Sequence, residues 1–370
     1  MQPMVTDLTR RALLKAALLS ASAPLLPLGC ATTRRDDPQP ALIGCAIHKG
    51  SQFRAVVADA QGQAIHQLPL PARGHGVAIH PTLTHAVAFA RRPGEFLMVF
   101  NYQNGELIKL QLAQPTRHFY GHGVYSNDGA WLYATEGEKA TSRGIIGVYD
   151  VQHSYQKVAE FSGFGIGPHE VIVMPDGRLT IGVGGVHTFG REPLNVESMM
   201  PSLTYLSHQG EVLEQRILND HHLSIRHLAH DDADTVLCGQ QYRGQPEEYP
   251  PLVALHDQGG ELIPLLAEPE QWARFNHYIA SIAATDQWIL ATSPRGNCYG
   301  IWSKETLQLV ELASLPDASG VVVQDQQFQV SSGAGLVVNS PYPQPEIRTR
   351  SNVQWDNHWS AIDYSRQKTE

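Results

Sequence analysis

The sequence has little charge, little cysteine and no long hydrophobic run. Charged residues make up 17% of its 370 residues, below the roughly 25% usual in globular proteins, and the net charge is −9. A nucleic-acid-binding protein normally carries a basic face, so this balance argues against a nucleic-acid partner. The four cysteines, at positions 30, 45, 238 and 298, form no CxxC and no close pair, so the sequence indicates neither a zinc finger nor a disulfide framework.

Local catalytic signatures are also missing. The chain has no GxSxG, HExxH, phosphate-binding loop or dinucleotide fingerprint in a usable context. It has no CxxCH either, so it attaches no c-type haem covalently. Short motifs therefore leave open whether the protein is an enzyme.

The N-terminal segment has the features of an export signal. Arg10-Arg11, followed by Leu13-Leu14-Lys15, resembles a twin-arginine (Tat) signal. The uncharged, mostly apolar run from Ala16 to Leu28 has 13 residues, whereas a membrane-spanning helix needs about 20. This length fits the apolar part of a signal peptide. We therefore predict that residues 1–30 direct export to the periplasm.

Two processing sites are compatible with this signal. Ala21-Ser22-Ala23 fits a signal peptidase, while Leu28-Gly29-Cys30 resembles the end of a lipobox, with an unusual Pro27 three residues before the cysteine. We favour lipidation of Cys30. Contact with the membrane is expected only through the signal or this lipid anchor. Residues 31–40 are predicted to be a flexible tether.

The rest of the chain repeats with a period of about 47 residues. Three segments align without gaps, and their histidines are 47 residues apart: Gly74-His75-Gly76-Val77, Gly121-His122-Gly123-Val124 and Pro168-His169-Glu170-Val171. Each precedes a short apolar stretch, a turn such as Asn127-Asp128-Gly129, and a second apolar stretch. An Asp-Gly between two apolar runs is a strong hairpin signal. Further strands follow, and four antiparallel strands per roughly 40–50 residues are typical of a propeller blade.

The repeats predict an all-β fold, a seven-bladed β-propeller in one domain over residues 41–365. Blades start near residues 75, 122, 169, 226, 279 and 319. The remaining blade is split: residues 43–48, 53–58 and 64–70 supply three strands, and His358 to Ile362 supply the innermost. Such closure removes exposed sheet edges. A six-bladed ring would require residues 279–318 or 319–350 to form something else.

Histidines occupy one register position in four neighbouring blades. The first strand of each blade lines the central channel, and His75 and His358 each begin a segment whose fourth and fifth residues are Ala and Ile. In the fifth blade either Arg226 or His227 takes this position. Ile279 and Ser319 take it in the last two.

Four imidazoles at one level of a channel indicate a transition-metal site. Imidazole binds iron, copper and zinc, and we predict His75, His122, His169 and His358 as ligands. Glu170 and Asp356 are placed to ligate the ion or to orient an imidazole. Two alternatives remain open. Protonated histidines with Arg226 and His227 would bind a carboxylate or phosphate, or the rings would be hydrogen-bonded channel filler.

Long loops are expected on the same face as these histidines. They join the second and third strands of their blades and contain Glu, Arg and Tyr at residues 135–144, 184–201, 239–251 and 292–299. Such loops around a channel mouth are typical of a platform for a substrate or partner, although solvated variable loops would look the same.

Several of these features together resemble a bacterial family of exported proteins of unknown function. They are the Tat leader, the paired Gly-His-Gly-Val starts, Ser224-Ile225-Arg226-His227-Leu228, Ser331-Ser332-Gly333 and Trp355-Asp356-Asn357-His358-Trp359. Members are commonly encoded beside imelysin-like, iron-regulated periplasmic lipoproteins and a di-haem protein similar to thiol oxidoreductases. The resemblance implies a role in periplasmic iron acquisition with these partners. It implies no reaction.

Three functional hypotheses follow. The first is an exported propeller whose channel histidines bind iron, copper or zinc in periplasmic iron uptake or handling. The second is a lactonase-type or hydrolase-type propeller enzyme acting on a small anionic substrate with His, Glu and Arg as acid–base groups. The third is a non-catalytic scaffold that binds partners across its loops.

Overall fold

The computed structural model describes residues 38–48, 50–231, 233–257 and 259–365. The predicted signal over residues 1–30, with Cys30, and residues 31–37 of the predicted tether lie outside the described residues. No helix among those described is long and apolar enough to cross a membrane.

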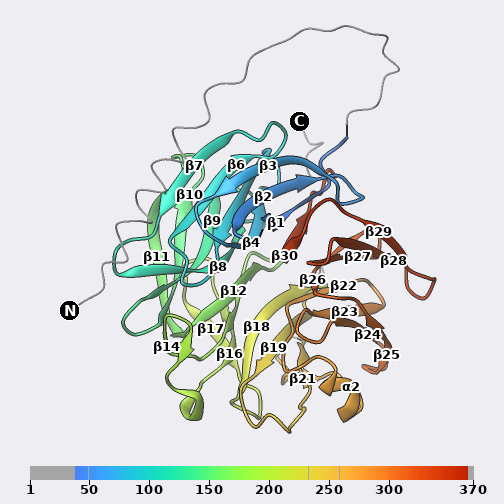
Figure 1. Cartoon of the computed structure of the whole chain (residues 1–370). Coiled ribbons are helices and arrows are strands. Elements are labelled where there is room, and N and C mark those ends of the chain that lie inside the picture. The colour runs from blue at the N-terminus through green and yellow to red at the C-terminus, as the bar shows by residue number, and fades with distance from the viewer. Residues whose placement is uncertain (1–37, 49, 232, 258, 366–370) are drawn as a thin grey trace, which may run out of the picture.

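The described residues form seven four-stranded antiparallel sheets arranged in a ring, as predicted (Figure 1). The innermost strands of consecutive sheets are neighbours around the axis. The predicted all-β, seven-bladed β-propeller is therefore confirmed, and residues 279–350 supply two complete blades. The six-bladed alternative is wrong.

Blade 1 joins the two ends of the chain. Its strands, from the axis outward, are β30 (Trp355–Ala361), β1 (Leu42–His48), β2 (Gln52–Ala58) and β3 (Ala64–Leu70). The inner strand begins earlier than predicted because Trp355 and Asp356 also pair with β1. Figure 1 shows the red end of the chain beside the blue β1.

The other six blades use consecutive strands, from the axis outward. Blades 2 to 4 are β4 (Gly74–Ile79), β5 (His85–Ala90), β6 (Phe96–Asn101) and β7 (Leu107–Leu112); β8 (Arg117–Tyr125), β9 (Trp131–Glu138), β10 (Arg143–Asp150) and β11 (Gln156–Ile166); and β12 (Pro168–Val173), β13 (Leu179–Val183), β16 (Ser202–Leu206) and β17 (Val212–Arg216). Blades 5 to 7 are β18 (Leu223–His230), β19 (Val236–Tyr242), β20 (Val253–His256) and β21 (Ile263–Pro264); β22 (Ser281–Ala284), β23 (Trp288–Ser293), β24 (Cys298–Ser303) and β25 (Leu309–Ser314); and β26 (Ala318–Gln324), β27 (Gln327–Ser332), β28 (Leu336–Ser340) and β29 (Ile347–Arg350).

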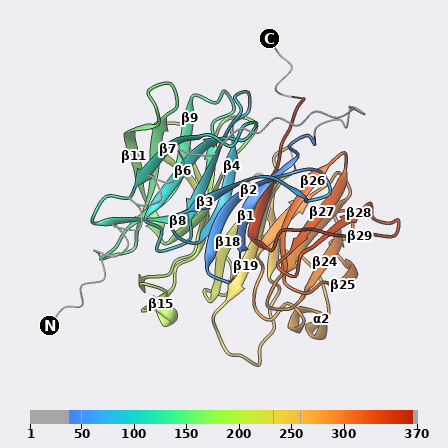
Figure 2. The ribbon, with the colours of Figure 1, turned by 45° about the horizontal axis from the view of Figure 1, so that its top comes forward.

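Small elements decorate the connections between these strands. In blade 4, β14 (Thr188–Phe189) and β15 (Glu192–Pro193) form a separate hairpin, followed by the 3-10 helix η1 (Val196–Ser198). This loop projects from the body of the ring (Figure 2). The α-helix α2 (Pro269–Ala273) lies between blades 5 and 6. Within the described residues, helix is thus confined to short segments of the connections.

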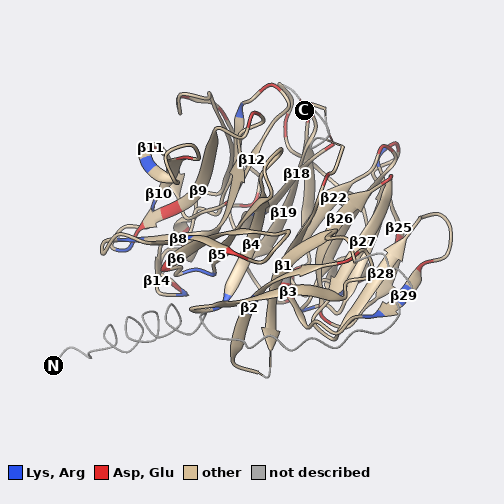
Figure 3. Cartoon of the chain, turned by 90° about the horizontal axis from the view of Figure 1, so that it is seen from above, with Lys and Arg blue, Asp and Glu red and all other residues tan. Residues whose placement is uncertain are grey.

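Apolar side chains fill the spaces between neighbouring blades. Between blades 2 and 3, for example, Phe89 and Val99 share one buried cluster with Phe119 and Leu132. Strand residues alternate between the two faces of a sheet, so both faces of a blade can pack against neighbours. Figure 3 shows that most of the strand ribbon carries no charge. The hydrophobic core is thus a set of layers around the axis, and the axis itself is left for polar groups.

The closing strand is held by two tryptophans. Trp355 and Trp359 are 2% and 3% exposed, and their ring centroids lie 5.2 Å apart. They share a buried cluster with Leu42 of β1 and Val337 of blade 7. Closure of the ring therefore depends on apolar packing as well as on the backbone pairing of β30 with β1.

We expect Trp359→Ala to lower the free energy of unfolding by about 3–5 kcal/mol, because it leaves a cavity at this seam. Trp131→Ala is the matched control, since Trp131 is 37% exposed and its loss is expected to cost about 0.5 kcal/mol. Urea unfolding followed by far-ultraviolet circular dichroism measures both. Equal losses in the two variants would contradict a special role for the seam.

Candidate metal centre

The channel histidines lie at irregularities in the innermost strands. The pairing register shifts between Gly74 and Val77 in β4, between Phe119 and Gly123 in β8, and between Pro168 and Glu170 in β12. His75, His122 and His169 fall inside these three interruptions. A β-bulge leaves its extra residue outside the regular ladder and redirects its side chain. The bulges thus turn the imidazoles toward the axis.

The inner strands β30 and β18 also carry bulges next to residues that face the axis. In β30 the register shifts so that Cys45 pairs with Asp356 while Gly44 pairs with Trp359, which places His358 in the interruption. In β18 the shift lies between Ile225 and His227, around Arg226. The sequence left open whether Arg226 or His227 faces the channel. With this bulge both do: Arg226 lines a cavity and His227 contacts the other imidazoles.

Glycines next to the histidines make this crowding sterically feasible. A Cβ on Gly76 would lie 2.8 Å from the carbonyl oxygen of Gly121 and 2.9 Å from Nδ1 of His122. Gly121 has φ +107°, and a Cβ there would lie 2.7 Å from Cδ2 of His75. Only glycine tolerates both conditions without displacement of a ring. The Gly-His-Gly motif is therefore the sequence signature of two inner strands in close approach.

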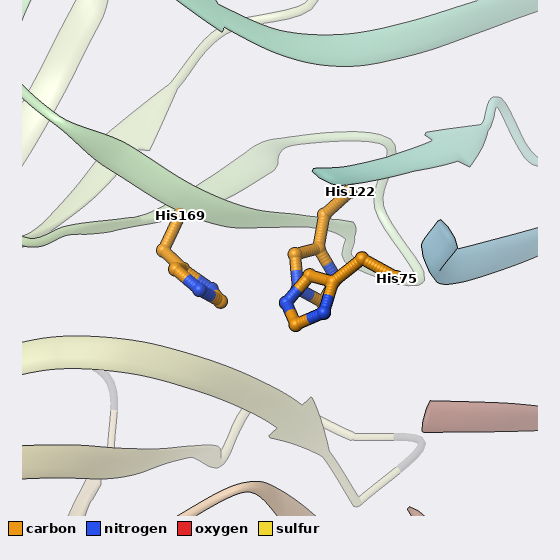
Figure 4. A group of neighbouring side chains, drawn as sticks. All are labelled: His75, His122 and His169. Carbon is orange, nitrogen blue, oxygen red and sulfur yellow. The ribbon is translucent and has the colours of Figure 1, made fainter. Parts of the chain in front are cut away.

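Five imidazoles form one compact group at the axis, which we call the five-histidine cluster (His75, His122, His169, His227 and His358). All five side chains are buried, with exposures between 2% and 9%. Ring centroids of His75 and His122 lie 4.7 Å apart, as do those of His122 and His169. Three of these rings point toward one another from separate strands in Figure 4.

His358 and His227 contact the other three rings of the cluster. The centroid of His358 lies 4.8 Å from those of both His75 and His122, and 4.7 Å from that of His227. His227 in turn lies 4.7 Å from His169. In two triads that share His122, the potential donor atoms all lie within 4.8 Å of one another: His75, His122 and His169, and His122, His227 and His358.

Several ring nitrogens in the cluster have no hydrogen-bond partner among the described residues. They are Nδ1 of His75, Nε2 of His122, Nδ1 of His169, Nδ1 of His227 and Nε2 of His358, and among these Nδ1 of His227 lies 3.4 Å from a carboxylate oxygen of Glu170. A buried polar atom without a partner is costly, and native structures rarely leave several at one point. The other four nitrogens, on His75, His122, His169 and His358, therefore fit a bound group that accepts nitrogen ligands.

Glu170 orients two of the imidazoles. Its Oε1 lies 3.3 Å from Nδ1 of His122, and its Oε2 lies 3.4 Å from Nδ1 of His227. Oε2 also accepts a hydrogen bond of 2.9 Å from the backbone N–H of Leu228. A carboxylate on Nδ1 fixes the ring and leaves Nε2 as the ligand atom, a common arrangement behind metal-bound histidine. Glu170 is thus a positioning residue.

Burial keeps most of the cluster uncharged. Desolvation, followed by the neighbouring histidines, lowers the pKa values of His75, His169 and His358 well below their usual range. Desolvation also lowers the pKa of His227, although Glu170 opposes this shift. Burial would raise the pKa of Glu170, but His122 and His227 outweigh burial and hold this pKa well below its usual range. Neutral imidazole is the form that binds metal ions.

Backbone groups exposed by the bulges find partners on the second strands. The hydroxyl of Thr135 on β9 is buried and lies 3.0 Å from the carbonyl oxygen of His122 and 3.1 Å from that of His169. This hydroxyl links two adjacent blades directly behind two imidazoles. The rings therefore project from a rigid frame, as a preorganised site requires.

The structure brings the four predicted ligands together and adds His227 to them. Asp356 forms a bidentate ion pair with Arg73. The Nε and Nη2 atoms of Arg73 each lie 2.5 Å from a carboxylate oxygen of Asp356. Arg73 was not foreseen from the sequence, because nothing local links residues 283 positions apart. The sequence did hint at the fifth imidazole, because it offered His227 as one of two residues for the channel position of the fifth blade.

The donor set suits a transition metal of the kind that imidazole prefers. Imidazole nitrogens with a carboxylate behind them fit iron, copper or zinc better than magnesium or calcium, which prefer oxygen. Ligands on one tetrahedral ion lie roughly 3.3 Å apart, given metal–nitrogen distances of about 2.0–2.1 Å. In each triad the candidate ligand atoms lie within 4.8 Å of one another.

Comparisons with known proteins show the fold and the family. Among proteins with curated functions, none matches the chain. The solved structure of Kuenenia stuttgartiensis Hydrazine Synthase is similar in fold, with a TM-score of 0.59 and 16% identity over 82% of this chain and 90% of that chain. The model of a family described as "Protein of unknown function (DUF1513)" matches residues 68–362, which include all five histidines. The chain therefore belongs to this family.

Proposed function

We propose that the protein binds a transition-metal ion through the five-histidine cluster and acts in iron uptake or handling in the periplasm. The observation that carries the proposal is the set of four buried imidazole nitrogens without partners among the described residues, on His75, His122, His169 and His358. A metal ion bound in the cluster would give such nitrogens a partner.

The role in iron handling rests on the sequence. The Arg10-Arg11 leader supports export by the Tat route, which carries folded proteins, and Leu28-Gly29-Cys30 supports a lipid anchor. The resemblance to exported proteins encoded beside imelysin-like lipoproteins and a di-haem protein supports iron as the cargo and these proteins as partners. A haem partner would supply electron transfer, since this chain has no CxxCH of its own.

The first test is the metal content of untagged protein purified after export. We expect close to one equivalent of iron, copper or zinc by inductively coupled plasma mass spectrometry. The double variant His75→Ala/His122→Ala removes at least one ligand from each triad, because His122 belongs to both. This variant should therefore lose the metal.

A buried histidine elsewhere controls for the loss of an imidazole. His256 lies outside the cluster, on the third strand of blade 5. It is 1% exposed, and its Nδ1 lies 2.6 Å from the hydroxyl of Tyr205. The His256→Ala variant should therefore lose stability but keep its metal. Circular dichroism checks the fold of all three proteins. No metal in the wild type, even after reconstitution with iron, copper and zinc salts, would refute the metal site. Copper or zinc with no iron would refute the iron role alone.

Glu170→Gln tests the positioning of the ligands. A glutamine carbonyl can still accept the N–H of Leu228, but its amide group offers donors to an imidazole where the carboxylate offered acceptors. We expect metal affinity to fall about 10-fold to 100-fold, as is usual when the carboxylate behind a ligand is lost. Competition with a chromophoric chelator measures the affinity.

Glu136→Gln is the matched control for this variant. Glu136 is also buried, and it accepts hydrogen bonds from Tyr149 and Lys157 at 2.6 and 2.8 Å on blade 3. This substitution should reduce stability with little effect on metal affinity. If both variants bind metal like the wild type, Glu170 does not orient the ligands.

A further inference from the structure

A cavity of about 490 Å³ lies beside the five-histidine cluster, and arginine is the commonest residue in its lining. His75 and His169 form part of its wall, so it borders the candidate metal centre directly. It takes side chains from the loops that follow the second strands of blades 2, 4, 5 and 6. Seven of the 27 lysines and arginines of the chain line it: Arg73, Arg91, Arg92, Arg191, Arg226, Arg243 and Arg295.

This concentration of positive charge is not balanced within the protein. Two carboxylates, Asp317 and Asp356, line the same cavity, and Asp356 is engaged by Arg73. For the other six arginines, the part of the chain that the structure describes offers no ion pair. The whole chain nevertheless has a net charge of −9. Positive charge is thus gathered here in an otherwise acidic protein.

Arg226 is the most informative member of the group. Its side chain is 3% exposed, and its Nε and Nη2 have no hydrogen-bond partner among the described residues. A buried guanidinium without a counter-charge is strongly unfavourable, and a bound anion would supply that charge.

Two of the other guanidinium groups lie against aromatic rings. Arg92 follows β5 and lies 6.0 Å from the ring centroid of Tyr120, and Arg295 lies 4.4 Å from that of Tyr278. Arg243 directly follows β19, and its Nε also has no partner among the described residues. Guanidinium groups stack well on aromatic rings and still present their N–H groups at the edge. These rings therefore help to position Arg92 and Arg295 at the cavity.

We propose that this cavity binds a small oxyanion with at least two negative charges, either an oligocarboxylate or a phosphate compound. Carboxylate and phosphate oxygens both match the paired N–H groups of arginine. The volume falls within the range of about 300–1,000 Å³ that is typical of small-molecule sites. The anion would lie next to His75 and His169. This inference goes beyond the metal site and holds whether or not an ion is bound there.

Thermal unfolding of metal-free protein tests the proposal, after dialysis against a chelator and removal of that chelator. Citrate, tricarballylate, phosphate, pyrophosphate and acetate are added separately at constant ionic strength. A ligand that binds only the folded state raises the unfolding temperature as its concentration rises. We expect this rise with at least one multivalent anion and not with acetate. Response to the carboxylates or to the phosphates assigns the class.

Arg226→Gln and Arg243→Gln should bind the responding anion at least tenfold more weakly, as measured by calorimetric titration. Without the anion, Arg226→Gln should be at least as stable as the wild type, because it removes an unpaired buried charge. Arg54→Gln is the control, since Arg54 donates to Gln67 at 2.7 Å in blade 1, away from the cavity. His122→Ala should also keep the response, since His122 does not line this cavity.

These variants separate the anion site from the metal centre. A His122→Ala protein that still responds to the anion shows that binding does not depend on the complete histidine cluster. The proposal is overturned if no multivalent anion stabilises the metal-free protein. It is also overturned if Arg226→Gln and Arg243→Gln both respond as the wild type does.

Discussion

Crowding of the innermost strands around a single axis determines much of the rest of this structure. Seven strands approach one line, and at Gly76 and Gly121 even a Cβ would collide with the neighbouring strand or its imidazole. Regular strands would direct alternate side chains into the same confined space. Bulges relieve that conflict by taking residues out of the ladder, and they decide which side chains reach the axis. Five of those side chains are histidines.

The polar groups at the axis destabilise the folded protein, whereas the apolar layers between blades stabilise it. The imidazoles and Arg226 lose hydration without full replacement by protein partners among the described residues, which is unfavourable. Apolar layers between blades, such as the one around Phe89 and Phe119, supply the favourable burial that holds the ring together. Functional sites commonly show this local conflict, with stability provided by the surrounding frame.

The sequence was sufficient for the architecture because a propeller is built from local repeats. The spacing of His75, His122 and His169 located three inner strands, and the alignment of His75 with His358 located the closing one. The sequence did not reveal that both Arg226 and His227 of β18 face the channel, because a bulge depends on how neighbouring blades pack and not on the local pattern. The sequence pointed to Arg226 as an anion-binding group but not to the arginines around it, because residues such as Arg73 and Arg243 come together only through the order of blades in space.

The position of His358 near the end of the chain has a consequence for biosynthesis. Four of the five imidazoles belong to blades 2 to 5, which are synthesised well before β30. The fifth is added only when the last strand inserts beside β1 and the ring closes. A nascent or truncated polypeptide thus presents an incomplete ligand set. An ion held by the whole cluster would bind only the closed ring and would therefore stabilise the pairing of β30 with β1.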